Sequence, residues 1–167
     1  MAQAQQPRFW CRVALMLVCV LSGCAHLPVD PTQVSVAVSP DWPKSGHVQG
    51  EVVLIVALRN DSKRALHFPV DDLSDPPLHL DWTHYKILKN SPDGFVEDLE
   101  RAPFADGVLP LGTLNIGAGD ATTLRVYFED ANKADCSQRF VVQLQDKSGS
   151  VFRSKPFRPC DWRLESR

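Results

Sequence analysis

Residues 136–160 have the sequence CSQRFVVQLQDKSGSVFRSKPFRPC, and they predict the fold class of the chain. The apolar residues of 140–144 recur at every second position, which is the period of a β-strand with one buried face. Residues 146–149 (DKSG) form a turn, and residues 151–157 continue as a second strand. Gly149 suits the left-handed position of a three-residue hairpin loop. The stretch therefore predicts an antiparallel β-hairpin.

The register set by this loop pairs Cys136 with Cys160, on the same face of the hairpin as the apolar residues. Pro156 and Pro159 interrupt the far end of the ladder, so the register need not extend as far as Cys160. We expect a structural disulfide, which would stabilise the fold by roughly 3.5 kcal/mol in the chain-entropy model. A redox-active pair is disfavoured because the wide spacing lacks the Cys-X-X-Cys arrangement that lowers a thiol pKa.

Upstream segments also predict strands. Valines alternate with small residues over 34–39, the pattern of a strand with one buried face. Residues 51–58 are apolar on both parities and rich in valine, which predicts a strand covered on both sides. Residues 60–63 (NDSK) then predict a turn.

A change of phase marks the middle of the chain. Apolar residues alternate over 78–82, and the alternation resumes in the other phase over 85–87, which predicts a β-bulge near Thr83. Residues 117–120 (GAGD) predict a turn that leads to a further alternating segment at 124–128.

Six or seven short strands with turns between them and no convincing helix predict an all-β, antiparallel β-sandwich. The body, from Val34 to Phe157, resembles an immunoglobulin or fibronectin type III domain at the level of the fold. It departs from the antibody pattern: the expected disulfide joins neighbouring strands, and Ala134 stands where that pattern has a tyrosine. We therefore expect an immunoglobulin-like β-sandwich of about seven strands over residues 34–167.

Residues 1–23 have the three parts of a secretory signal: a basic start with Arg8 and Arg12, an apolar stretch over 13–21, and small residues before Cys24. The apolar stretch is less than half as long as a membrane-spanning helix. A cleaved signal is therefore favoured over a transmembrane anchor.

Residues 21–24 (LSGC) resemble the lipobox of bacterial lipoproteins. The resemblance implies a diacylglyceryl group on the Cys24 sulfur, cleavage before Cys24, further acylation of the new amino group, and residues 24–33 as a lipidated N-terminus with a short tether. A chance cysteine after an ordinary signal is the alternative. Because Ala25 rather than Asp follows, the resemblance favours a lipid-anchored protein of the outer membrane, facing the periplasm.

Composition and motifs disfavour several classes of function. With 18 Lys and Arg against 20 Asp and Glu, the chain has no basic excess for a nucleic-acid partner. His79 and His84, the closest two histidines, would lie on opposite faces of a regular strand, and residues 71–75 (DDLSD) lack the pattern of a calcium loop. No motif points to catalytic residues, a metal or another cofactor, so we expect a protein that is not an enzyme.

Residues 89–107 predict a long loop with four sizeable apolar residues, a type of segment that often serves recognition. These candidate partner residues are Phe95, Val96, Leu99 and Phe104. The alternative, which we favour, is that Phe95 and Val96 begin another strand while Leu99 and Phe104 close over the core.

Three functions from two classes remain open. The first is a membrane-anchored envelope lipoprotein that binds another envelope protein or serves as an accessory part of an assembly. The second is a periplasmic inhibitor or immunity protein that neutralises an enzyme. The third is a hydrolase whose residues meet only in space.

Overall fold

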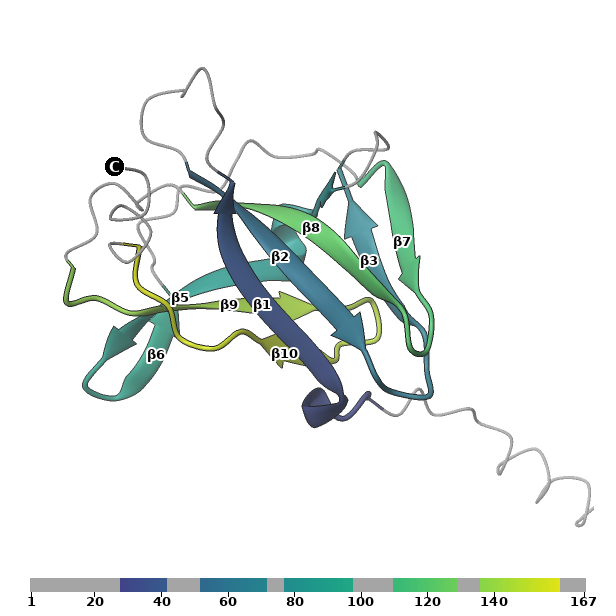
Figure 1. Ribbon diagram of the computed structural model, residues 1–167, viewed down its shortest axis with the longest axis horizontal. Coiled ribbons are helices and arrows are strands. Elements are labelled where there is room, and N and C mark those ends of the chain that lie inside the picture. Colours follow the sequence, from purple (N-terminus) through teal and green to yellow (C-terminus); the bar gives the residue numbers. More distant parts are fainter. Residues whose placement is uncertain (1–27, 42–51, 72–76, 98–109, 129–135, 160–167) are drawn as a thin grey trace, which may run out of the picture.

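The computed structural model describes residues 28–41, 52–71, 77–97, 110–128 and 136–159 (Figure 1). Within these ranges the chain forms ten β-strands and two short 3-10 helices, which confirms the all-β prediction. The elements are η1 (Pro31–Gln33), β1 (Val34–Asp41), β2 (Val52–Asn60), β3 (Leu66–Val70), β4 (Leu78–His79), η2 (Trp82–His84), β5 (Tyr85–Ser91), β6 (Gly94–Glu97), β7 (Gly112–Ile116), β8 (Ala121–Phe128), β9 (Phe140–Gln145) and β10 (Val151–Arg153).

The first sheet has the strand order β1-β2-β8-β4. Its inward face carries Leu54, Val56 and Leu58 of β2, all of them buried. On the other face of β2, Val53 and Ile55 are half-buried and Ala57 is exposed. The prediction of a strand covered on both sides is therefore wrong, because apolar residues on the outer parity are only partly shielded from solvent.

The second sheet has the order β10-β9-β5-β6. In the hairpin β9–β10, Val151 pairs with Gln145 and Phe152 with Leu144, which is the register expected from the sequence. Gly149 has a positive φ of 84°, so the glycine occupies the left-handed position of the loop as predicted.

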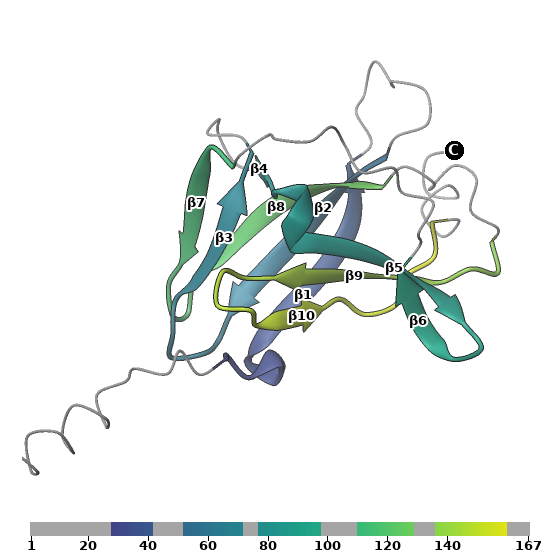
Figure 2. The ribbon, with the colours of Figure 1, turned by 180° about the vertical axis from the view of Figure 1, so that it is seen from behind.

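The chain passes from one sheet to the other between β4 and β5 (Figure 2). The phase change near Thr83 is therefore not a bulge. It arises because η2, capped by the Asp81 side chain, separates two strands that belong to different sheets. β4 also pairs in parallel with β8. The sandwich therefore contains one parallel pair among the described strands, whereas the sequence predicted antiparallel strands.

A third sheet of two strands, β3 and β7, was not foreseen. Leu66, Phe68 and Val70 of β3 are fully or almost fully buried, as is Ile116 of β7. The short strands β3, β4, β6 and β7 raise the number above the predicted seven.

The buried side chains of all three sheets form one hydrophobic cluster. Aromatic contacts join the layers: the ring centroids of Phe128 and Phe140 are 4.8 Å apart, and those of Phe68 and Phe152 are 6.3 Å apart. Trp82 is partly buried and packs against this cluster. The three sheets thus enclose a single core, as in a β-sandwich.

Candidate functional site

The predicted recognition loop begins as a hairpin of β5 and β6. Lys89 pairs with Val96 and Asn90 with Phe95, so residues 89–97 are not a loop. The alternative in which Phe95 and Val96 begin a strand is confirmed. Leu99 and Phe104 lie outside the described residues.

This hairpin lies on the other side of the molecule from β3 and β7 in both views (Figures 1 and 2). β6 is the edge strand of its sheet. Val96 is 46% exposed, whereas Phe95 is half-buried. The hairpin therefore presents an apolar side chain on a sheet edge to solvent.

Polar contacts hold the hairpin in place. Lys86 Nζ lies 2.7 Å from Glu97 Oε2, which links the two strands. At the base, the Asn90 N–H donates to the Arg139 carbonyl over 2.9 Å, and the Asn90 Oδ1 accepts from the Arg139 N–H over 2.7 Å. These contacts tie the hairpin to the segment that precedes β9.

The predicted lipid-bearing Cys24 and the disulfide partner Cys160 lie outside the described residues. Cys136 lies in a turn before β9. The hairpin register shifts by one residue at its outer end, because Ser154 bonds to Val142 whereas Phe157 pairs with Phe140. The ladder is thus interrupted at the Pro156 region, as predicted, and the disulfide stays a prediction.

A second candidate site joins β3 to the crossover between the sheets. The Asp71 N–H donates to the His79 carbonyl over 3.0 Å, and the Asp81 N–H donates to the Pro69 carbonyl over 3.1 Å. This antiparallel pairing places Asp71 and Asp81 on the same face, where each carboxyl group affects the pKa of the other.

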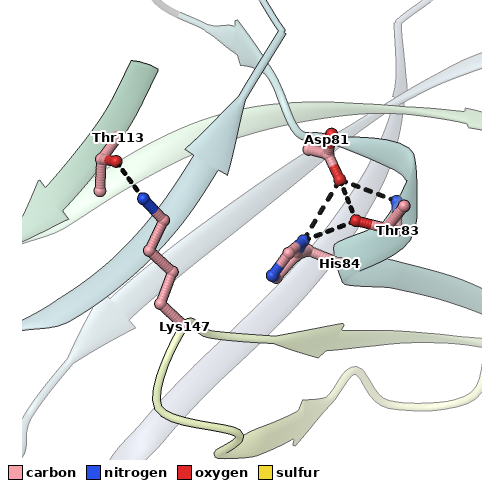
Figure 3. A network of polar contacts seen from close by, with 5 residues as sticks. All are labelled: Asp81, Thr83, His84, Thr113 and Lys147. Carbon is pink, nitrogen blue, oxygen red and sulfur yellow. Dashed lines mark hydrogen bonds and ion pairs between the residues drawn. The ribbon is translucent and has the colours of Figure 1, made fainter. Parts of the chain in front are cut away.

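Asp81 is almost completely buried and is the centre of a polar network (Figure 3). Its Oδ1 accepts from the Thr83 N–H over 2.9 Å and from the Thr83 hydroxyl, and lies 3.2 Å from His84 Nδ1. The Thr83 hydroxyl is also 2.9 Å from His84 Nδ1. The Asp81 carboxyl therefore caps η2 and orients the His84 ring.

The pKa values of the two carboxyl groups are shifted in opposite directions. Burial, followed by the adjacent Asp81 charge, raises the pKa of Asp71 to about 6. Burial alone would also raise the pKa of Asp81, but hydrogen bonds from Thr83, His84 and Asp71 hold it below its ordinary value. Below about pH 6 the pair therefore holds one proton on Asp71, which donates to the Asp81 carboxylate.

A pair of this kind suits proton exchange, and such pairs also occur as purely structural contacts. Within the described ranges, no group of three or more histidine, cysteine or acidic side chains is arranged to hold a metal ion. Asp71, the first residue of the acidic segment 71–75, is half-buried and lies close enough to Asp81 for the Asp81 charge to raise its pKa. The Asp-x-Thr sequence at 81–83, which suits a helix cap, was the signal that the sequence analysis missed.

The Asp71→Asn variant is expected to be more stable than the parent by about 1 kcal/mol above pH 6, a value discounted for the partial exposure of Asp71. An acid with a raised folded-state pKa loses stability as pH rises from its unfolded value of 3.8 to about 6. Asparagine keeps the hydrogen bond to Asp81 without the second charge. Urea unfolding at about pH 3.5 and about pH 7.5, roughly either side of this window, measures the difference.

The exposed Asp61, ion-paired to Arg59 at 2.7 Å, provides the matched control. Asp61→Asn is expected to change stability by less than about 0.5 kcal/mol at either pH. An Asp71→Asn variant with the same pH dependence as the parent would show that the pair does not share a proton.

Comparison with known proteins adds little. No protein-family model matches the chain. No curated protein sequence matches it either. Among solved structures, the X-ray structure of Northeast Structural Genomics Consortium target SoR45 is 12% identical, with 76% of this chain and 86% of that chain covered and a TM-score of 0.31. A TM-score this low does not establish a common fold.

Proposed function

We propose that this chain is a bacterial envelope lipoprotein whose immunoglobulin-like β-sandwich is a non-catalytic protein-binding or accessory assembly module. The observation that carries the proposal is the β5–β6 hairpin, which presents Val96 on the edge strand of a sheet. Edge strands offer backbone donors and acceptors to a partner strand, and an exposed apolar side chain adds contact area.

The lipid anchor rests on the sequence. The lipobox-like tetrad Leu21-Ser22-Gly23-Cys24 follows a nine-residue apolar stretch, and Ala25 favours retention in the outer membrane with the body in the periplasm. In the described part of the chain, no helix has the length and apolar character needed to cross a bilayer. We propose attachment through acyl chains on Cys24, on the strength of the lipobox-like tetrad.

We also propose a disulfide between Cys136 and Cys160. Both residues flank the β9–β10 hairpin, and the envelope is a compartment where disulfides persist. The one-residue shift at Phe157 changes which residues face each other at the outer end, so a bond would form across an offset pair.

Crosslinking and affinity capture of the tagged, lipidated protein from native membranes tests the binding proposal. We expect a partner in stoichiometric amount that is reduced at least about tenfold by Val96→Asp, because a buried charge opposes an apolar contact. Leu111→Asp is the matched control: Leu111 is 64% exposed and precedes β7, away from the hairpin. Equal capture by both variants would contradict the role of the hairpin.

The identity of the captured partner distinguishes between an assembly module, an inhibitor and a hydrolase. Very tight capture of one enzyme, with loss of its activity, would indicate an inhibitor or immunity protein instead. Recovery of the protein without any partner would favour the hydrolase hypothesis. The Asp71–Asp81 pair is then the pair of residues to test for catalysis.

A further inference from the structure

The segment that follows the proposed lipid attachment is fixed to the body from its sixth residue. The Val29 N–H donates to Ser150 Oγ over 2.9 Å, and the Val29 side chain is buried. Immediately after it, Asp30 caps η1 by accepting from the Thr32 N–H over 2.9 Å. The chain can therefore act as a tether only before Val29.

This tether is short. Five residue steps separate Cys24 from Val29, and a fully extended chain of that length spans at most about 18 Å. β1 alone, with eight residues, is about 25 Å long. A body held so closely at one point cannot turn freely, so the end that carries Val29 stays near the attachment point.

Hydrogen bonds join η1 and three turns at that end. The Asp61 N–H donates to the Gln33 carbonyl over 2.8 Å, which ties the β2–β3 turn to η1. The Gly119 N–H donates to the Asn60 carbonyl over 2.7 Å, which adds the β7–β8 turn. The β9–β10 turn, residues 146–150, receives Val29 as described. We call η1 and these three turns the tethered end.

The charge of the tethered end also suits a lipid surface. Its basic and acidic side chains are equal in number, whereas the whole chain has a formal charge of -2. They are Arg59, Lys63, Arg64 and Lys147 against Asp30, Asp61, Asp120 and Asp146. The Lys147 ammonium donates to the hydroxyl of Thr113, in the first half of β7 (Figure 3). A neutral surface meets less repulsion from anionic headgroups than the acidic remainder does.

We infer that the tethered end is the membrane-facing surface of this protein, in contact with phospholipid headgroups, which leaves the β5–β6 hairpin clear of the lipid. The inference rests on the proposed lipid anchor. Both ribbon views place the hairpin on the other side of the molecule from the β2–β3 and β7–β8 turns (Figures 1 and 2). The arrangement would keep Val96 available to a partner.

Site-specific photocrosslinking to lipid tests the inference. Benzoylphenylalanine replaces Ala118 or Ser148 at the tethered end, and Leu111 or Asp93 as matched exposed positions, in the full lipidated chain. Ala118 and Leu111 follow and precede the same strand, β7, so they sample its two ends. The protein is placed in vesicles of phosphatidylethanolamine and phosphatidylglycerol, and lipid adducts are measured by mass spectrometry.

We expect adducts at positions 118 and 148 to exceed those at 111 and 93 at least about fivefold, because headgroup contacts require close approach. Equal adducts, or more adducts at 111 or 93, in protein that floats with the vesicles would overturn the orientation while leaving the anchor intact. Protein that does not float and forms no adducts would instead refute the lipid anchor.

Lengthening the tether gives a second readout. A flexible Gly-Ser insert of about ten residues after Leu27 raises the maximum span by about 35 Å. We expect the preference for positions 118 and 148 to fall to near parity. An unchanged preference with the longer tether would contradict the restraint that the short tether is inferred to impose.

Discussion

Replacing Asn60 with alanine is expected to lower the free energy of unfolding by about 3 kcal/mol and the Tm by about 10 °C. Asn60 is fully buried. Its Nδ2 donates to the carbonyl oxygens of Arg64, Ile116 and Gly117 over 2.6, 3.1 and 3.0 Å. Its Oδ1 accepts from Ser62, from the N–H over 3.1 Å and from the hydroxyl over 2.6 Å.

The expected loss of stability is large because alanine removes the Asn60 amide and leaves in place the groups to which the amide was hydrogen-bonded. The Ile116 carbonyl and the Ser62 N–H and hydroxyl would lose their partner in buried contacts, and each uncompensated buried group costs about 1–3 kcal/mol. The same side chain fastens the β2–β3 turn to the end of β7, so its loss also removes one link between the β3–β7 sheet and the first sheet.

Thermal and urea unfolding of purified protein measure this effect. Asn115→Ala is the matched control, since Asn115 is exposed and its Oδ1 lies 2.7 Å from Nδ1 of the exposed His67 ring. We expect Asn115→Ala to change stability by less than about 0.5 kcal/mol. Similar small losses in both variants would show that the Asn60 amide does not hold the turn.

The contrast between Asn60 and the β9–β10 hairpin shows what a sequence can predict. The hairpin follows from residues close together in the chain: alternating side chains, and a glycine at the left-handed position. Residues 60–63 were recognised as a turn for the same reason. The hydrogen bonds of Asn60 to residues 116 and 117 join segments far apart in the chain, and no local sequence pattern predicts them.

The same reason explains the missed third sheet and the misread crossover. β3 contains Pro69, which weakens a strand pattern, and its partner β7 lies more than forty residues away. The change in the parity of the apolar residues near Thr83 is visible in the sequence. Its cause, a transfer between sheets, depends on pairing with β8 and β9, which periodicity does not reveal.

The candidate site was predicted in part. Apolar residues in a polar, turn-rich segment pointed to Phe95 and Val96, and the structure places both on the β5–β6 hairpin. The Asp71–Asp81 pair was not predicted, because a carboxyl that shares a proton is identical in sequence to one that is solvated. Only the pairing of Val70 with Leu80 brings these two aspartates to one face.

Replacing Cys24 with alanine is expected to abolish palmitate incorporation and to move the protein from the membrane fraction to the supernatant. Without the thiol no thioether can form, so the acyl chains that hold the mature protein are absent. Each buried methylene contributes about 0.8 kcal/mol to anchoring, so the loss of two or more chains removes far more than any surface contact supplies. Labelled palmitate and fractionation measure the result.

Cys136→Ala is the matched control, because it removes a cysteine from the body, and with it the proposed disulfide, and leaves the lipobox intact. It should incorporate label as the parent does. Label on the Cys24→Ala protein would show that the acyl group is elsewhere, and membrane retention without label would point to an uncleaved signal or a membrane-bound partner. A salt and carbonate wash separates these two, since only a peripheral partner contact is released.

Release from the membrane should leave the fold unchanged, and this separates anchoring from folding. Among the described residues, the N-terminal segment is held by the bond from the Val29 N–H to Ser150 Oγ and by the Asp30 cap on η1. The Tm of Cys24→Ala, after removal of residues 1–23, should therefore match that of the parent within about 2 °C. If the proposed hairpin site is also independent of the anchor, the released protein still captures its partner, and Val96→Asp still prevents capture. Binding that required Cys24 would instead mean that the partner recognises the protein only as the membrane presents it.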